Sequence, residues 1–313
     1  MAARPGCVTI KAMHALAHPR YLVAGLINLE TTLRVDAFPL AYNSQNFPFF
    51  GVGSSVSGVG YNIARALKVL GDEFDFLALI GQDPPAGLVR QALAQDAIPS
   101  AGVLTLLRET PQSVILYDPS GRRQNHTDLK DIQDQAYPPG LFQAALQSCD
   151  IAVLCNINFN RPFLQAARQA GKPVATDVHA LYWLFDDYNR DFIAAADILF
   201  LSHDNLPEPP EDFARHLLER WHPAVLVVGL GSQGALLVHE GQLQRVPAVQ
   251  TRPVVNTIGA GDALFSAFLH AYPRLGDPYE ALRRATFFAS WKIGERSASQ
   301  GFPSLEEWQQ LYA

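Results

Sequence analysis

The segment Gly259-Ala260-Gly261-Asp262 has the residue types best suited to chemistry in this sequence. It follows a β-branched run and precedes an apolar pattern typical of a helix. Its first three residues would present consecutive backbone N–H groups at a helix N-terminus, which favours an anion such as phosphate. The carboxylate of Asp262 could then accept the proton of an attacking hydroxyl group. Taken alone, the four residues also fit an ordinary glycine turn with an acidic first helical turn.

Other polar, glycine-rich stretches are candidates for binding substrate or nucleotide. "SGVGYN" (57–62) places Gly58 before a helix and Asn62 in its first turn, so it either caps the helix or recognises hydroxyl groups. "GLGSQG" (229–234) has the glycine spacing of a dinucleotide fingerprint, but a strand follows it instead of a helix. We therefore expect a tight turn with nucleotide contacts there. "HDN" (203–205) is either a metal-binding segment or a polar loop at a strand end.

The elements that must position these residues alternate between strand and helix. Strands are expected at 21–27, 74–81, 150–154, 173–177, 198–201 and 224–229, most of them followed by a helix. This order predicts an α/β fold with a mostly parallel sheet and helices on both faces. In such a sheet, ligands bind beyond the carboxyl ends of the strands. The polar and glycine clusters follow those ends, so they are expected to converge on one cleft.

Two β-rich insertions interrupt the alternation, at 31–57 and 101–125. The first has proline punctuation and no helical pattern, and the second is expected to contain a hairpin of 103–107 with 113–123. We expect them to form a small sheet beside the main one, within a single domain over 1–313.

Composition excludes several function classes. The chain is 48% hydrophobic and 17% charged, with a net charge of −6 and scattered basic residues, so we expect no nucleic-acid surface. We expect no membrane span, and the three cysteines, without a C-x-x-C pair, fit a reducing cytoplasm. His14 and His18 lie one helical turn apart, but without a third ligand nearby we favour an irregular leader over a metal site.

Taken in order, the motifs resemble the ribokinase, or PfkB-type carbohydrate and nucleoside kinase, family over about residues 21–303. "NTIGAGDALFSAFL" (256–269) is similar to its signature D-T-x-G-A-G-D followed by a helix. "SGVGYNIARALKVLG" (57–71) resembles the segment G-G-x-G-x-N-x-A, and "LIGQDPPAGLVRQAL" (79–93) resembles G-x-D-x-x-G. "GLINLETTLRVDAFP" (25–39) looks like the substrate strand that enters the lid.

The resemblance implies that Asp262 is the general base and that Gly259, Ala260 and Gly261 form an anion hole. The two insertions would be a β-lid, which in many members supports a homodimer. The cofactors would be ATP and Mg²⁺, often with a monovalent cation such as K⁺. Substrate contacts are expected from Asn28, Glu30, Gly58 and Asn62. Apart from the resemblance, the polar stretch "CNINFN" after the strand 150–154 is expected to supply Asn156, Asn158 and Asn160 near the pocket, with Asn158 as a substrate contact. Nucleotide contacts are expected from Ser202, Asn205, Gly229, Gly231, Gly234 and the segment 289–299.

Three positions depart from the family pattern. Glu30 stands where an aspartate is usual, which changes the reach of the carboxylate. The family's N-x-x-E segment is Ser202-His203-Asp204-Asn205 here, so Asn205 lacks the carboxylate and Asp204 is the candidate metal ligand. Asn256 replaces the first aspartate of the signature, in the loop associated with the monovalent cation.

We therefore expect an ATP-dependent kinase that phosphorylates a hydroxymethyl group of a sugar or a nucleoside. The aromatic lid segment "FPFF" (47–50) would either stack a nucleobase or fill the seam between lid and main sheet, which leaves both substrate classes open. The alternative, suggested by the altered metal segment, is a catalytically weak sugar- or nucleotide-binding protein that kept the kinase fold.

Overall fold

A nine-stranded sheet forms the centre of the computed structural model, which describes residues 16–295 and 297–313. Its strand order is β13-β12-β11-β10-β9-β8-β1-β4-β5, and only β12 and β13 pair antiparallel to their neighbours. The strands are β1 (Arg20–Ala24), β4 (Glu73–Ile80), β5 (Val103–Thr105), β8 (Ile151–Leu154), β9 (Val174–Ala180), β10 (Ile198–Ser202), β11 (Val225–Gly229), β12 (Ala235–His239) and β13 (Gln242–Val246). His14, considered above as a metal ligand, lies outside the described residues.

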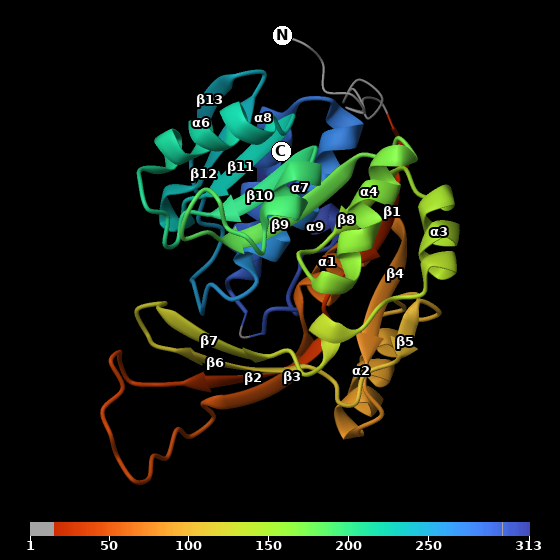
Figure 1. The fold of residues 1–313 in the computed structure, drawn as a ribbon. Coiled ribbons are helices and arrows are strands. Elements are labelled where there is room, and N and C mark those ends of the chain that lie inside the picture. Colours follow the sequence, from red (N-terminus) through yellow and green to blue (C-terminus); the bar gives the residue numbers. More distant parts are fainter. Residues whose placement is uncertain (1–15, 296) are drawn as a thin grey trace.

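Helices cover both faces of this sheet, as the sequence predicted (Figure 1). Successive strand residues point to opposite faces, so Tyr21 and Val23 belong to one buried cluster and Leu22 and Ala24 to the other. The first cluster includes residues of α1 (Val59–Val69), α2 (Pro84–Gln95), α7 (Ala260–Leu275), α8 (Pro278–Lys292) and α9 (Leu305–Tyr312). The second includes residues of α3 (Pro139–Ser148), α4 (Arg161–Gln169), α5 (Arg190–Ala195) and α6 (Pro210–Trp221).

A separate four-stranded sheet lies beside this body, in the order β3-β2-β6-β7 (Figure 1). It consists of β2 (Asn28–Arg34), β3 (Val52–Ser57), β6 (Gln112–Tyr117) and β7 (Arg123–Asp128). The prediction that 103–107 forms a hairpin with 113–123 is wrong. Val103–Thr105 pairs in parallel with β4 in the main sheet, because Val103 is buried in its core. The second contribution to the small sheet is instead the β6–β7 hairpin, which starts later than residue 101 and extends past 125.

None of the helices that the structure describes has both the length and the apolar character needed to cross a membrane.

Candidate active site

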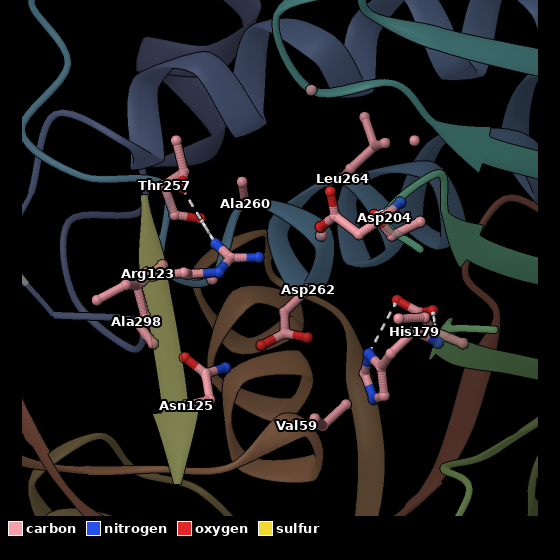
Figure 2. Close-up of a pocket in the computed structure, with 18 of the residues that line it drawn as sticks. Val59, Arg123, Asn125, His179, Asp204, Thr257, Ala260, Asp262, Leu264 and Ala298 are labelled. Atoms are coloured by element: carbon pink, nitrogen blue, oxygen red, sulfur yellow. Dashed lines mark hydrogen bonds and ion pairs between the residues drawn. The ribbon is translucent and has the colours of Figure 1, made fainter. Parts of the chain in front are cut away.

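A cleft of about 1880 Å³ lies where the carboxyl ends of the parallel strands face the four-stranded sheet (Figure 2). Its lining includes Asn156 after β8, Asp177 of β9, Ser202 of β10 and Gly229 of β11. The convergence expected from the sequence is therefore present at this edge. Pockets for one drug-sized molecule measure roughly 300–1,000 Å³, so this cleft has room for two ligands.

The N-terminus of α7 forms the floor of the cleft, and Gly259, Ala260, Gly261 and Asp262 all line it. Gly259 caps the helix at φ 76°, a left-handed conformation in which a Cβ would lie 2.6 Å from the carbonyl oxygen of Ala298. A side chain is thus excluded at this position by both conformation and space. The first N–H groups of a helix have no intrahelical acceptor, so that of Gly261 can bind an anion, whereas the Ala260 N–H already donates to the Thr257 carbonyl over 3.2 Å.

Asp262 lies in the first turn of α7, within reach of α1. The Nδ2 group of Asn62 donates a hydrogen bond to its Oδ2 atom over 2.6 Å. Burial raises the pKa of Asp262, while the nearby His179, the Asn62 hydrogen bond and Arg123 favour its charged form. The result is a carboxylate with increased proton affinity, held by Asn62 at the N-terminus of α7.

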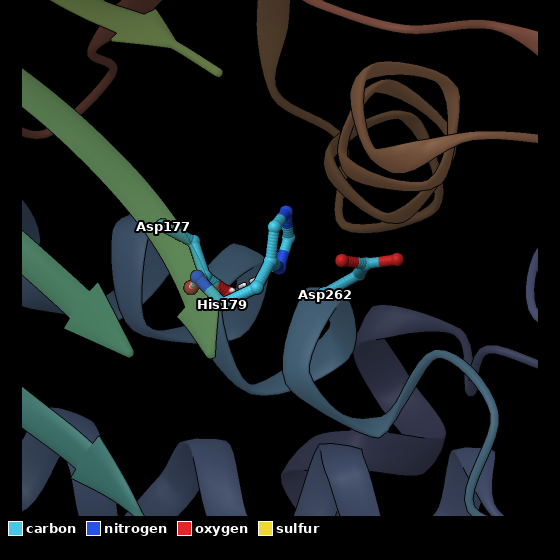
Figure 3. Close-up of side chains that lie close together, drawn as sticks. All are labelled: Asp177, His179 and Asp262. Carbon is cyan, nitrogen blue, oxygen red and sulfur yellow. Dashed lines mark hydrogen bonds and ion pairs between the residues drawn. The ribbon is translucent and has the colours of Figure 1, made fainter. Parts of the chain in front are cut away.

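Asp177 and His179 stand next to Asp262 (Figure 3). One ligand atom from each of the three residues lies within 4.8 Å of the others, a spacing compatible with a metal ion. Asp177 Oδ1 accepts a hydrogen bond from the His179 backbone N–H over 2.8 Å, which fixes the turn at the end of β9. Sequence reasoning did not single out these two residues. The signal was the polar "TDVH" at a strand end, whose distance from Asp262 depends on the fold.

On the opposite wall, β2 contributes two buried acceptors. Asn28 Nδ2 donates to Ser113 Oγ over 3.1 Å, but Asn28 Oδ1 has no hydrogen-bond partner within the described part of the chain. The same holds for Glu30 Oε1, and burial raises the pKa of this carboxyl group. Both residues line the cleft together with the expected Gly58 and Asn62. Buried acceptors normally have partners, so these two atoms are suited to ligand hydroxyl groups.

Asn158 does not lie where the sequence analysis put it. Among the described residues, those lining the cleft include Asn156 but not Asn158. The amide of Asn158 donates to the Gln133 carbonyl and accepts from Arg161, and Asn158 lines a separate, smaller pocket. Ile157 still lines the cleft, and the 3₁₀ turn η3 (Asn158–Asn160) begins at the next residue.

The expected nucleotide-contacting residues gather on the side of β10 and β11. The cleft is lined there by Ser202, Asp204, Asn205, Gly229, Gly231 and Gly234. The backbone N–H of His203 donates to the Gly229 carbonyl over 2.9 Å, which joins the loop after β10 to the end of β11. A short 3₁₀ turn, η4 (Gly231–Gln233), then leads into β12. This arrangement lacks the helix that a dinucleotide fingerprint requires.

Arg123 of β7 reaches the cleft from the four-stranded sheet (Figure 2). Its Nη1 group donates to the Thr257 carbonyl over 2.6 Å and to the Thr257 hydroxyl over 3.2 Å. The small sheet is thereby attached to the loop that precedes the anion site. Nothing in the sequence around Arg123 pointed to this contact.

Comparison with known proteins decides the family. The model of the pfkB family carbohydrate kinases matches residues 20–305. The chain belongs to this family. It is therefore a phosphotransferase with an alcohol group as acceptor, and family members of this kind use ATP, in general with Mg²⁺.

Individual relatives of this pfkB-family kinase cover nearly its whole length. An acarbose 7(IV)-phosphotransferase of Actinoplanes is 26% identical over 85% of this chain and 89% of its own. An ATP-dependent ribose-1-phosphate kinase of Halopiger xanaduensis is 26% identical over 89% and 93%. The solved structure of a microbiome-derived acarbose kinase, Mak1, superposes with a TM-score of 0.84 at 25% identity, covering 94% of this chain and 99% of that one. The ribokinase-like fold predicted from the sequence is confirmed.

Proposed function

We propose that this kinase transfers the γ-phosphoryl group of ATP to a hydroxymethyl group of a sugar, with Asp262 as the general base. The observation that carries the proposal is the position of Asp262 in the same helical turn as the anion site, inside a cleft large enough for two ligands. Loss of the acid at Asn205 leaves this arrangement unchanged.

In the reaction, Asp262 takes the proton of the acceptor hydroxyl as its oxygen attacks the γ-phosphorus. A new O–P bond forms, the bond to the β-phosphate oxygen breaks, and ADP leaves. The N–H groups of Gly259, Ala260 and Gly261 stabilise the charge on the transferred group, with that of Ala260 shared with the Thr257 carbonyl. The raised pKa of Asp262 suits a group that must hold a proton during transfer.

One structural observation favours a sugar over a nucleoside. The unpaired acceptors Asn28 Oδ1 and Glu30 Oε1 suit hydroxyl groups of a sugar ring, which both substrate classes carry, so the nucleobase is what separates the two classes. The aromatic segment considered for base stacking is turned to solvent, with Phe49 78% and Phe50 95% exposed. The names of the relatives, which include kinases of acarbose and of ribose 1-phosphate, agree with a carbohydrate acceptor.

Oxygen ligands for Mg²⁺ are present on both sides of the anion site. Asp204, the candidate from sequence, lines the cleft on the nucleotide side. Asp177 lines it too, and a Cβ built on Gly261 would lie 3.9 Å from its Oδ2 atom. Bound with ATP, Mg²⁺ would neutralise phosphate charge, and carboxylates are its usual protein ligands. A lower apparent Mg²⁺ affinity in Asp177→Asn than in Asp204→Asn would assign the ion to Asp177.

The decisive experiment measures ADP release with ATP and a panel of pentoses, hexoses, oligosaccharides and nucleosides. Wild type is compared with Asp262→Asn, which keeps the size of the side chain but not its basicity. We expect turnover with at least one sugar and a fall in kcat of about 10²–10⁴ in the variant. If no compound exceeded the variant's rate, the kinase proposal would fail and the alternative, a binding protein with the kinase fold, would stand.

We also infer that two copies associate through the small sheet. The loop between β2 and β3 extends from the body of the molecule (Figure 1). It exposes large apolar side chains, among them Tyr42 (94%), Phe49 (78%) and Phe50 (95%). Such a patch is unusual on a monomer surface. Light scattering should give a dimer for wild type and a monomer for Phe50→Ser; a monomeric wild type would refute the inference.

A further inference from the structure

Lys292, the last residue of α8, ends in a buried position directly behind the anion site. The residue is 0% exposed. Its Nζ group donates to the carbonyl of Ser297 over 2.5 Å and lies 3.4 Å from the carbonyl of Ile258, one residue before the helix cap Gly259. The ring of Phe302 lies 6.0 Å from Nζ. A buried ammonium group is costly, so one held on backbone carbonyls calls for an explanation.

The family resemblance places a monovalent cation at the loop that begins at residue 256, and the residues present do not fit one. Asn256 offers a neutral amide in place of a carboxylate. Its Oδ1 atom accepts from the Ile258 N–H over 2.9 Å, and its Nδ2 group donates to the Glu295 carbonyl over 3.1 Å. The carbonyls of Ile258 and Ser297 already accept from Lys292. Three oxygen atoms at this loop, Asn256 Oδ1 and the carbonyls of Ile258 and Ser297, thus already accept hydrogen bonds from donors of the protein itself.

The charges around Lys292 favour an ammonium ion there. Burial lowers its pKa to about 8, against the opposing effects of Asp262 on α7, Glu295 after α8 and Glu30 on β2, while the positive charge of Arg252 lowers it further. Glu295 already pairs with Arg252 over 3.2 Å, so its charge is largely compensated. The remaining acids face the cleft. Lys292 is thus a fully buried cation whose ammonium group contacts the carbonyl of Ile258, directly before the segment proposed as the anion site.

We propose that the Lys292 ammonium group takes the place of a monovalent cation, so that this kinase needs no K⁺. Its fixed charge joins the carbonyls on both sides of the loop and holds Gly259 and the following N–H groups in position for the transferred phosphoryl group. Lys292 is a positioning residue, because it touches the loop and not the reacting atoms. The inference rests on the proposed kinase activity, but part of its test does not.

The first measurement is the salt dependence of the wild-type enzyme. Phosphorylation of the best sugar is compared in K⁺, Na⁺ and tetramethylammonium chloride at one ionic strength. We expect rates within about twofold of one another, because the positive charge is covalently attached. A stimulation of tenfold or more by K⁺ would overturn the proposal. Absence of sugar phosphorylation in every salt would instead reject the proposed function.

The second measurement uses Lys292→Ala, which vacates the carbonyls of Ile258 and Ser297. We expect a loss of activity in tetramethylammonium that K⁺ or NH₄⁺ partly restores, and a melting temperature that rises with K⁺ but not with tetramethylammonium. The thermal response is independent of any activity. A loss that no cation restores, with no thermal response, would show a structural role only and overturn the proposal.

The matched control is Lys172→Ala. The Lys172 ammonium group also donates to a backbone carbonyl, that of Cys149, but at a site outside the cleft. Neither the activity nor the melting temperature of Lys172→Ala should acquire a response to cations.

If Lys292→Ala does not fold, Lys292→Arg provides the test. Because arginine stays charged, the activity of this variant should remain independent of K⁺. It should also persist above pH 8, where the activity of wild type declines as Lys292 loses its proton. A decline of the variant's activity at the same pH as wild type would contradict the proposal.

Discussion

Substituting Gly261 by alanine should separate stability from activity in this kinase. Gly261 is the second residue of α7 and lies open to the cleft. A Cβ at this position would have the Oδ2 atom of Asp177, 3.9 Å away, as its nearest neighbour, an ordinary van der Waals distance. The added methyl group therefore points into the cleft without a clash, and it occupies the space where an anion would approach the helix N-terminus.

The two effects have opposite signs and can be estimated. Gly→Ala at a compatible position stabilises by about 0.4–1 kcal/mol, which for a chain of this length is roughly 0.5–1.5 °C in Tm. A phosphate oxygen bonded to the Gly261 N–H at about 2.9 Å would be pushed away by a carbon that needs about 3.5 Å. Loss of one such donor costs about 2.7–4 kcal/mol in the transition state, so kcat should fall by about 10²–10³.

The position-matched control is Gly140→Ala. Gly140 is also the second residue of its helix, α3, and no heavy atom of the described residues lies within 4 Å of a Cβ built there. The Gly140→Ala variant should show the same small rise in Tm by calorimetry and an unchanged kcat in ADP-release assays. A Gly261→Ala enzyme that is as active as this control would refute the anion site. A fall in its Tm would refute the steric estimate.

Four further results are expected. Gly259→Ala should lower the free energy of unfolding by about 1–3 kcal/mol in urea titrations, because residue 259 has φ 76° and the new Cβ would lie only 2.6 Å from a carbonyl oxygen. An unchanged unfolding midpoint would contradict this argument. Because burial raises the pKa of Asp262, kcat should decline on acidification at a higher pH than for an ordinary aspartate. Asn62→Ala, which removes a hydrogen bond that favours the ionised form, should move this decline to still higher pH, and a pH profile identical to wild type would refute it. Arg123→Met removes a charge-assisted hydrogen bond worth about 1.5–3 kcal/mol and should lower kcat/KM at least tenfold; full activity would show that this contact plays no part in transfer.

The sequence by itself determined the features that depend on neighbours in the chain. The proposed anion site at Gly259–Gly261 and the acid Asp262 lie in one stretch at the start of α7, so contiguous residues specify both. The alternation of strands and helices predicted the sheet covered on both faces, because each apolar run has to be buried on the side to which its residues point. The capping of α7 by glycine follows from the same local rules.

Only the tertiary structure decided which distant residues join that turn. Asp177, Arg123 and Lys292 reach it from β9, β7 and α8, and no local pattern indicates which strand ends or helix ends become neighbours. The sequence also left open whether Val103–Thr105 belongs to the main sheet or to the small one, since a short apolar strand is compatible with both sheets. The pairing with β4 places it in the main sheet. The physical reason is that local sequence fixes backbone conformation, whereas long-range packing selects which side chains share a cleft.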